Sequence, residues 1–318
     1  LASAHLASSF KNSITVSVDG FGDFSSSAWG VGRGNKIKID KQIFFPHSLG
    51  IFYQAMTQFL GFHNYGDEYK VMGLAPYGNP TFMKEMHEIL YINKNGEYSL
   101  NLDVFRHHNE KISYEWRNGS PKVGQLFNSK MEKIFKIPSR KKNTSLSQNY
   151  LDIARSTQAM YEKAFFNLLN AVYKKHKITN LTLSGGCAMN SVANGKIFQN
   201  SPFKKIYIPA AAGDAGGAIG SAYTVAVKLG FQKKNLEINH AYLGPSFENN
   251  YHKILLKKNQ NRINKARCTI KYIGEENVLC SSIAKSISKG KVVGWFQGRM
   301  EWGPRALGNR SILGDPRL

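Results

Sequence analysis

Apolar and polar residues follow two different periods along the chain. Between residues 13 and 45 apolar positions alternate with polar ones and are interrupted by turns that contain glycine or aspartate, which predicts three short strands. Over 49–62, and again over 147–175, apolar residues recur at helical spacing, which predicts one helix in each range. Between 180 and 230, apolar runs that end in glycine alternate with helical patterns, so strand and helix should alternate there.

The other parts of the chain have no sustained period. Residues 62 to about 146 are polar and rich in turns, with one helical piece over 80–90, and we interpret them as an insertion that faces the substrate. After residue 232 a polar linker begins, and a strand over 292–298 leads into an arginine-rich motif. We therefore predict two domains, residues 1–232 and residues 233–318.

The order of these elements predicts the fold class. Three antiparallel strands, a helix, and then strands that alternate with helices form an α/β unit with a partly parallel sheet. This is the order of a ribonuclease-H-like half, the unit that is duplicated in the actin, sugar kinase and heat-shock ATPase superfold. One such half is visible, and it is followed by the start of a second, α+β domain.

Composition favours a soluble globular protein. Of 318 residues 42% are hydrophobic, which is enough for a sizeable core. No apolar run reaches the roughly 18 residues of a membrane span, and the first ten residues lack the features of a signal peptide, so we expect a cytoplasmic protein. The three cysteines are widely spaced, and we expect them to be reduced.

The chain is strongly basic. Lys and Arg number 43 against 21 acidic residues, a formal net charge of +22, which favours polyanions or phosphorylated small molecules as partners. The excess is mostly lysine along the whole chain, with one acid-free run over 253–271 and a small cluster around Arg140. Diffuse lysine is more typical of a solvated surface than of a protein that reads nucleic acid.

Two aspartates stand where predicted strands turn into the next element. Asp19 ends a strand in "VDGFGD", and Gly20 lets the backbone turn tightly so that a carboxylate and amides can face a phosphate or a metal. Asp214 opens a predicted helix in "GDAGGAIGSA". The alternatives are an Asp-Gly hairpin turn for Asp19 and a helix cap for Asp214.

The stretch "LSGGCAMNS" places two glycines between a strand and a helix. The free amides at such a helix start bind anions, so Gly185, Gly186 and Asn190 are candidates to hold a nucleotide. Alternatively, the glycines only allow close packing and Cys187 is a buried filler. The loops that carry Asp19, Gly185 to Asn190 and Asp214 should meet at the carboxyl edge of one sheet. Together they predict a site for a nucleotide and a metal.

Three further candidates lie outside these loops. His5 could add an imidazole to the oxygens of Asp19 and Asp214, a set that suits Fe(II), Mn(II) or Zn(II), although a lone histidine is usually structural. In "GDEYKVMGLAPYG", Glu68 and Lys70 could orient an acid and a cation on a substrate, or the stretch could be a well-capped loop.

The arginine-rich motif is "GRMEWGPRALGNRSILGDPR", residues 298–317. Guanidinium groups pair with phosphate oxygens and stay charged, so Arg299, Arg305 and Arg310 are candidates to bind a phosphorylated substrate. The alternative is that they cap carbonyls and stack on Trp295 and Trp302.

Four stretches in this order, "GDEYKVMGLAPYG", "LSGGCAMNS", "GDAGGAIGSA" and the arginine-rich motif, resemble the O-carbamoyltransferases of the nodulation (NodU) and antibiotic-biosynthesis type. The resemblance implies an actin-like superfold domain for carbamoyl transfer, joined to a carbamoyl-adenylate-forming domain. It also implies that this chain is an internal fragment.

The resemblance further implies the site and its substrates. ATP and carbamoyl phosphate would make carbamoyl adenylate, whose carbamoyl group passes to a hydroxyl of a sugar-like or secondary-metabolite acceptor. His5, Asp19 and Asp214 would hold iron(II) or another divalent cation, although the family's second histidine, four residues before His5, is Leu1 here. Gly20, Gly185, Gly186 and Asn190 would hold the nucleotide, and Glu68 and Lys70 would lie near the acceptor.

The expected partners are therefore the small-molecule acceptor and the nucleotide, with no membrane and no nucleic acid; a homodimer is left open. The net charge leaves as an alternative a tRNA-modifying or nucleic-acid-binding protein of the threonylcarbamoyl-tRNA type. However, no stretch interleaves surface aromatics with basic residues as RNA-binding platforms do. A small-molecule kinase of the same superfold is a further alternative, but it would not account for "GPRALGNRS".

Overall fold

The computed structural model describes residues 1–116 and 119–317. The chain divides into two compact units, Leu1–Ile238 and Asn239–Leu318, and each is described by itself below. The first unit therefore ends at Ile238, a few residues after the boundary that the change in composition at residue 232 predicts.

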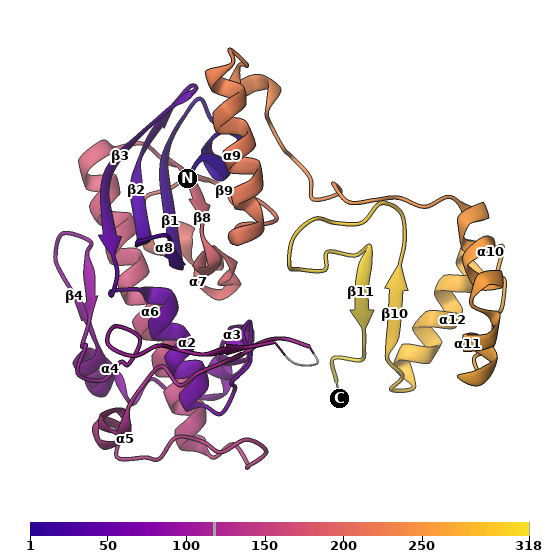
Figure 1. Ribbon diagram of the computed structural model, residues 1–318, viewed down its shortest axis with the longest axis horizontal. Coiled ribbons are helices and arrows are strands. Elements are labelled where there is room, and N and C mark those ends of the chain that lie inside the picture. The colour runs from indigo at the N-terminus through magenta and orange to yellow at the C-terminus, as the bar shows by residue number, and fades with distance from the viewer. Residues whose placement is uncertain (117–118, 318) are drawn as a thin grey trace. The chain divides into compact units, whose positions relative to one another are not determined.

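A five-stranded sheet forms the centre of the first unit (Figure 1). Its order is β3-β2-β1-β8-β9. The first three strands, β1 (Asn12–Gly22), β2 (Ser25–Arg33) and β3 (Lys36–Phe44), pair antiparallel, as the alternating pattern predicts. β8 (Asn180–Ser184) pairs parallel with β1, and β9 (Lys205–Tyr207) pairs parallel with β8. The molecule is thus mixed α/β with a mixed central sheet, and β1 lies in the middle.

The two faces of the central strands differ in chemistry. Ile14, Val16 and Val18 of β1 are fully buried members of the hydrophobic core. The alternate residues Ser13 and Thr15 are equally buried, and the Ser13 hydroxyl lies 3.4 Å from that of Thr182 on β8. Because side chains alternate across a strand, β1 has an apolar face and a hydroxyl-lined face, and both are covered.

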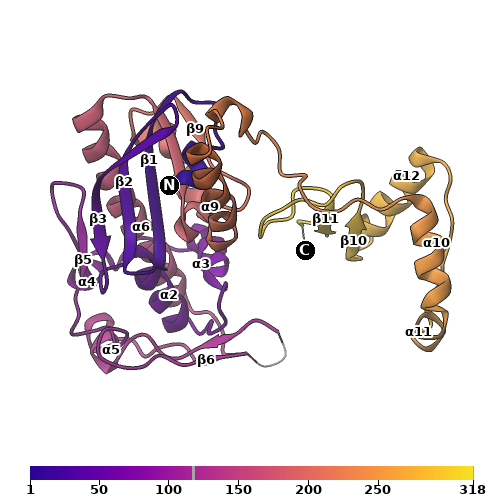
Figure 2. The same cartoon turned by 45° about the horizontal axis from the view of Figure 1, so that its top comes forward.

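Helices α2 (Leu49–Phe59) and α6 (Gln148–His176) cover the apolar face, and α1 (Ala2–His5) and α9 (Asp214–Lys228) lie on the other side (Figures 1 and 2). α2 begins at Ser48, whose hydroxyl accepts a hydrogen bond from the Ile51 amide and so caps the helix. α9 approaches α1 closely, because a Cβ at Gly220 would lie 3.0 Å from the Ser3 nitrogen. Helices therefore pack on both faces of the sheet.

The predicted insertion contains more regular structure than its composition indicates. Besides α4 (Met83–Ile89), which corresponds to the expected helical piece, it forms α3 (Glu68–Leu74), the 3-10 helix η1 (Ala75–Tyr77) and α5 (Ser129–Phe135). It also forms two hairpins, β4 (Leu90–Ile92) with β5 (Tyr98–Leu100) and β6 (Tyr114–Glu115) with β7 (Lys122–Val123). Their apolar side chains, including Val71, Phe105 and Phe135, join the main core. Such scattered residues have no period, so the prediction of a single helix there was wrong.

The segment after β8 is also divided more finely than predicted. In place of one helix over 188–199, it forms η2 (Gly186–Met189), α7 (Ser191–Gly195) and α8 (Ile197–Asn200). The break occurs at Asn190, whose side chain accepts a hydrogen bond from the Ala193 amide and begins α7. A short 3-10 helix, η3 (Lys233–Asn235), ends the unit, and the buried Lys233 ammonium donates to the Ser8 carbonyl.

The second unit holds helices α10 (Asn249–Lys258), α11 (Gln260–Lys265) and α12 (Glu276–Ser288) and one hairpin. In that hairpin β10 (Val293–Phe296) pairs antiparallel with β11 (Arg310–Leu313), and Val293 stands opposite Leu313. The arginine-rich motif therefore forms the connection between β10 and β11 and continues through β11.

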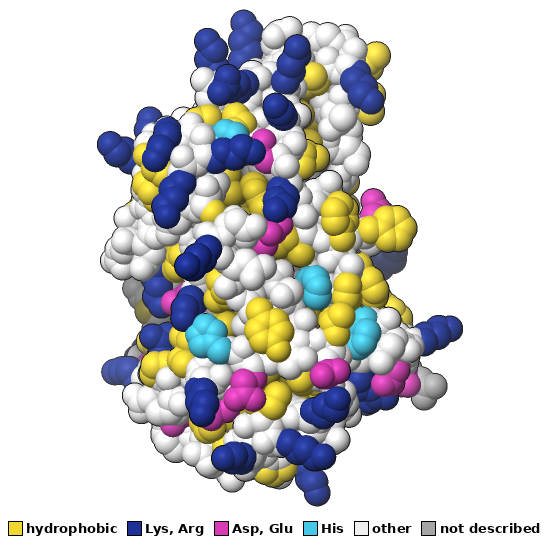
Figure 3. All heavy atoms as spheres, turned by 90° about the vertical axis from the view of Figure 1, so that its left-hand side faces the viewer, with side chains coloured by type: hydrophobic (Ala, Val, Ile, Leu, Met, Phe, Trp, Pro, Cys, Tyr) yellow, Lys and Arg dark blue, Asp and Glu magenta, His cyan; other side chains and the backbone are white. Residues whose placement is uncertain are grey.

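Lysine and arginine side chains are scattered over the face of the molecule drawn in Figure 3, among hydrophobic and uncharged ones, and do not gather into one patch. This distribution matches the diffuse lysine of the sequence. Within the described part of the chain, no helix has both the length and the apolar character needed to cross a membrane.

Candidate active site

Asp19 lies where β1 departs from regular pairing. The register with β2 shifts between Val18 and Gly22, so the strand bends directly after its last core residue. An Asp19 carboxylate oxygen accepts a hydrogen bond of 2.7 Å from the Gly20 amide, and the Asp19 carbonyl accepts one of 3.0 Å from the Ser48 hydroxyl at the start of α2. The bend and the two hydrogen bonds fix the carboxylate at the carboxyl end of the central strand.

The loop after β8 closes against this bend. Gly185 has a φ of 90°, and a Cβ there would lie 2.1 Å from the Val18 carbonyl oxygen, so only glycine fits. Its amide donates to the Ala212 carbonyl at 2.8 Å, which ties this loop to the one before α9. The next amide, that of Gly186, donates to the Asp19 carboxylate. The two glycines therefore have the positions that the sequence predicts for them.

Asp214 reaches the same edge as the first residue of α9. Gly213, which precedes it, packs on Gly186, since a Cβ at Gly213 would lie 3.7 Å from the Gly186 Cα. Burial raises the pKa of Asp19, and the nearby Asp214 carboxylate raises it further, against the lowering by the amides of Gly20 and Gly186. Because these two carboxylates repel each other, a divalent cation between them would be stabilised.

His5 does not join the two aspartates. It is fully buried against β1 and β2, where one ring nitrogen lies 2.8 Å from the Ser13 hydroxyl and the other donates to the Gly34 carbonyl at 2.9 Å. Ser13 stands at the opposite end of β1 from Asp19, and burial lowers the pKa of His5 to about 4. The ring is thus held as a structural histidine.

The three residues therefore do not form the metal set that the resemblance implies. Among residues 1–116 and 119–317 no group of three or more His, Cys, Asp or Glu side chains is arranged to hold a metal ion. Both ring nitrogens of His5 contact groups within the protein, and a metal at these three residues stays a prediction. Asp19 and Asp214 are the two carboxylates that would hold a divalent cation at this edge.

Glu68 and Tyr65 extend the site from the insertion. Glu68 begins α3 and is half-buried; burial raises its pKa, and the charge of Asp67 adds to the effect. Tyr65 is half-exposed. Burial raises its pKa, and the negative charges of Asp214, Asp19 and Glu68 raise it further. The sequence analysis missed Tyr65, which stands one residue before the "GDEYKVMGLAPYG" stretch.

The Lys70 side chain takes part in the turn that precedes α3. Its ammonium forms an ion pair of 2.7 Å with the Asp67 carboxylate and lies 5.3 Å from the centre of the Phe62 ring. Asp67 also accepts the Asn64 amide at 3.2 Å, so the pair closes the turn before α3. This arrangement corresponds to the alternative of a well-capped loop for Lys70.

Asn190 lies inside the protein, with 7% of its surface exposed. Its carboxamide forms two reciprocal hydrogen bonds with Gln158 of α6, of 3.0 and 3.1 Å, besides capping α7. Because Asn190 is buried, it is less able to contact a nucleotide directly than the glycines of the same loop are. Gln158 is a second residue that the sequence analysis missed, because its helical pattern shows only that it is on a buried face.

In the second unit a buried acid organises the arginine-rich motif. Glu301 accepts the amides of Leu307 and Asn309 at 2.9 and 2.7 Å, and its other oxygen lies 3.4 Å from Nε of Arg310. Glu301 has an exposed fraction of only 3%, and the sequence analysis missed it too.

Two of the predicted phosphate-binding arginines contact carbonyl groups. Arg310 donates to the carbonyls of Gly303 and Arg305, and Arg299 donates to that of Gly244 at 2.8 Å. These contacts match the alternative in which the arginines cap carbonyls. Binding of a phosphorylated substrate by Arg299, Arg305 and Arg310 stays a prediction.

Comparison with known proteins identifies the family. Residues 1–223 match the family model of the carbamoyltransferase N-terminus, and residues 284–318 match that of the carbamoyltransferase C-terminus. The chain therefore belongs to the carbamoyltransferase family, a family of transferase enzymes, as the four motifs predict.

Individual relatives agree with this assignment. The chain is 38% identical to an uncharacterized protein of Synechocystis sp. over 99% of its own length and 49% of that protein. It is 34% identical to nodulation protein NolO of Bradyrhizobium diazoefficiens over 99% of the chain and 52% of NolO. It is also 29% identical to the 3'-hydroxymethylcephem-O-carbamoyltransferase of Streptomyces clavuligerus, over 43% of the chain and 23% of that enzyme. The chain thus spans about half the length of the first two relatives.

Proposed function

We propose that the full-length protein is an O-carbamoyltransferase that uses ATP and carbamoyl phosphate. In the proposed reaction, carbamoyl phosphate, water and ATP first give carbamoyl adenylate, phosphate and pyrophosphate. The carbamoyl group then passes to a hydroxyl of a small acceptor, either sugar-like or a secondary metabolite, and AMP leaves.

One observation carries this proposal. Asp19, the loop with Gly185 and Gly186, and Asp214 meet at one edge of the sheet, in a chain that matches both carbamoyltransferase family models. The carboxyl edge of a sheet is where α/β folds bind nucleotides. The strand order β3-β2-β1-β8-β9 supports the further proposal that this unit is one half of the actin and sugar-kinase superfold.

The charges at this edge favour a nucleotide held together with a cation. The start of α9, a helix of 15 residues, offers amides to a phosphate, but Asp19 and Asp214 would repel it. A divalent cation, iron(II) on the resemblance, would be held by these two carboxylates and would neutralise the phosphate charge. His5 has no part in the proposed cation site.

Glu68 is the proposed acceptor of the hydroxyl proton. The raised pKa of Glu68 makes its carboxylate a stronger base than an exposed one, and the charge of Glu68 acts on Tyr65, which also senses Asp19 and Asp214. As the acceptor oxygen forms its bond to the carbamoyl carbon, the bond from that carbon to AMP breaks. The hydroxyl proton moves to Glu68, and the electron pair leaves with AMP.

The test uses the full-length protein with ATP and labelled carbamoyl phosphate. Pyrophosphate should appear only when both substrates are present, and Arg305→Ala should reduce its release by about tenfold or more because a charged phosphate contact is lost. Glu68→Gln should leave pyrophosphate release intact and slow transfer of label to an alcohol, whereas the exposed Glu88→Gln should change neither. Absence of pyrophosphate that depends on carbamoyl phosphate would refute the proposal.

A further inference from the structure

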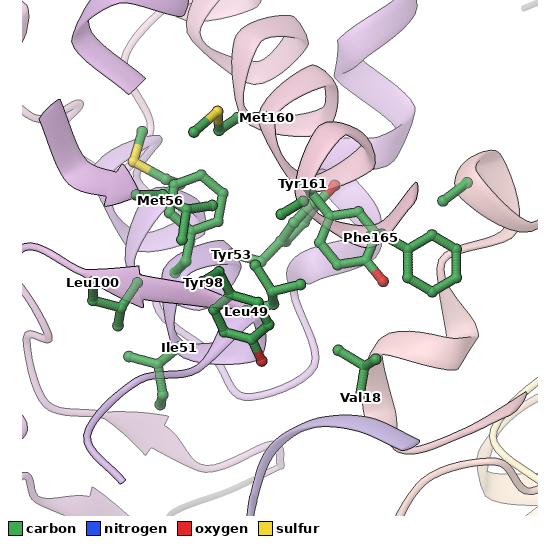
Figure 4. Packing of buried hydrophobic residues seen from close by; sticks show 14 of the residues in the cluster. Val18, Leu49, Ile51, Tyr53, Met56, Tyr98, Leu100, Met160, Tyr161 and Phe165 are labelled. Atoms are coloured by element: carbon green, nitrogen blue, oxygen red, sulfur yellow. The ribbon is translucent and has the colours of Figure 1, made fainter. Parts of the chain in front are cut away.

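Two buried side chains and one partly buried side chain of α6 form hydrogen bonds with the segment that follows the glycine loop. Gln158, Tyr161 and Glu162 lie at positions i, i+3 and i+4 of this helix, and therefore on one face. Each is hydrogen-bonded to the segment between β8 and α8. Figure 4 shows Tyr53 of α2 and Tyr161 of α6 projecting toward one another in the core, with ring centres 5.7 Å apart.

Gln158 is the centre of this network. It has no exposed surface. Its carboxamide oxygen accepts from the Tyr53 hydroxyl at 2.8 Å and from Asn190 at 3.0 Å, and its nitrogen donates to Asn190 at 3.1 Å and to Glu162 at 2.9 Å. All four hydrogen-bonding positions of the amide are therefore used.

The partners of this network are distributed along the loop that faces Asp19. The Tyr161 hydroxyl donates to the Cys187 carbonyl at 3.1 Å, within the 3-10 turn that begins at Gly186. Asn190 ends that turn. Glu162 binds the Lys196 ammonium at 2.7 Å, just after α7. α6 thus holds the segment from Cys187 to Lys196, which directly follows the two glycines beside Asp19.

From this arrangement we infer that Gln158, supported by Tyr161, is a positioning residue for the nucleotide: it fixes the loop 185–190, whose Gly186 amide holds the Asp19 carboxylate, at the edge of the sheet where the nucleotide would bind. The inference rests on the proposed function for the identity of the ligand. Gln158 touches no substrate and acts through Asn190, whereas Tyr161 acts through the Cys187 carbonyl. When all hydrogen-bonding positions of a buried side chain are used, its partners can take only one arrangement. A hydrophobic contact is not directional and would not restrict them in this way.

The geometry gives the expected size of the effect. Gln158→Leu leaves the buried Asn190 amide without its partner, and the cost of one unsatisfied buried amide corresponds to a loss of about 10- to 100-fold in affinity for a ligand of the loop. Tyr161→Phe removes one hydrogen bond to the loop and keeps the ring packing, so a loss of about 3- to 10-fold is expected.

The test measures AMP binding by calorimetry on the full-length protein, in an Arg305→Ala background that weakens nucleotide binding by the second unit. The dissociation constant for AMP should rise by the factors given above. Thr157→Val is the matched control: Thr157 is equally buried on the same helix, but its hydroxyl bonds only to the Ile153 carbonyl. This variant should bind AMP normally even if its melting temperature falls.

Two further measurements separate positioning from folding. Without the Arg305 change, Gln158→Leu should retain pyrophosphate exchange dependent on carbamoyl phosphate, a reaction of the second unit, which a general loss of folded protein would reduce equally. Gln158→Leu combined with Asn190→Leu should weaken AMP binding by less than the product of the two single effects, because both changes remove the contact between these side chains, while Asn190→Leu also removes the cap of α7.

The inference is overturned if Gln158→Leu binds AMP with wild-type affinity, or if the unsubstituted loop binds no AMP in the Arg305→Ala background. Should Gln158→Leu fail to fold, Tyr161→Phe decides, and normal AMP binding by that variant also overturns the inference. By contrast, a wild-type protein that binds AMP but forms no pyrophosphate refutes the proposed reaction and leaves the role of Gln158 standing.

Discussion

Replacement of Gly185 by alanine tests whether the close approach of the β8 loop to β1 builds the site. Gly185 has φ 90° and ψ 161°, a combination that residues with a Cβ rarely adopt. The added Cβ would lie 2.1 Å from the Val18 carbonyl oxygen and 2.6 Å from its carbon. Both contacts are with backbone of the central strand, so no side chain can rotate to relieve them.

The expected loss of stability follows from the backbone conformation of residue 185 and from the contact of the added Cβ with Val18. The backbone conformation costs about 1–3 kcal/mol for a residue other than glycine, and overpacking of a buried contact adds about 1–3 kcal/mol. The loop must move by roughly 1 Å to restore a normal contact, and a displacement of that size in an active site can lower the rate by about 100-fold. We therefore expect a loss of about 3–5 kcal/mol in stability and at least about 100-fold slower carbamoyl transfer.

The assay follows thermal unfolding and carbamoyl transfer in the full-length protein. Its control is Gly217→Ala, because Gly217 lies within α9 and a Cβ there meets nothing within 4 Å. That variant should be unchanged or stabilised by about 0.5–1 kcal/mol, since alanine is the better helix former. If Gly185→Ala unfolds and transfers carbamoyl groups like the wild type, the close approach of the loop is not what forms the site.

Three other predictions address His5, Glu301 and Asp214. Since burial lowers the pKa of His5 from 6.5 to about 4, the unfolded chain takes up the proton first as the pH falls, so the stabilisation is complete above pH 6.5 and is lost toward pH 4. The loss is roughly 3 kcal/mol, and unfolding of His5→Gln measured across this range should lack it. Glu301→Ala leaves the Leu307 and Asn309 amides without their acceptor, so pyrophosphate exchange should fall by about tenfold or more. Asp214→Asn should weaken Mn²⁺ binding, measured by titration, by about tenfold or more while His5→Gln does not; the reverse result would return His5 to the cation site.

Much of the fold can be predicted from periodicity. The alternation over residues 13–45 gives three antiparallel strands, and helical spacing gives α2 and α6 nearly at their observed ends. Periodicity fails where apolar residues are few and far apart in sequence. In the insertion, Phe135 packs its ring on Phe59 of α2, with ring centres 5.2 Å apart, and no local pattern in the sequence records that contact.

The site can be predicted in part for the same reason. Asp19, Gly185 and Asp214 stand at the ends of predicted elements, and the chemistry of strand-to-helix loops is local. Tyr65 and Gln158 were missed because their roles depend on residues far away in the chain: Gln158 is 32 positions from Asn190. The partners of His5, Ser13 and Gly34, could not be predicted, since residue type alone does not tell which groups its two nitrogens contact.

The sequence by itself determined the family, the α/β order of elements and the glycines that only a close backbone approach requires, because motifs and steric limits are properties of neighbouring residues. The tertiary structure decided which charged and polar groups meet. It placed Tyr65 where the charges of Asp19, Asp214 and Glu68 act on it, and it placed the ring of His5 between Ser13 and Gly34. Hydrogen bonding and charge repulsion act through space, and the distances that set them exist only after the chain has folded.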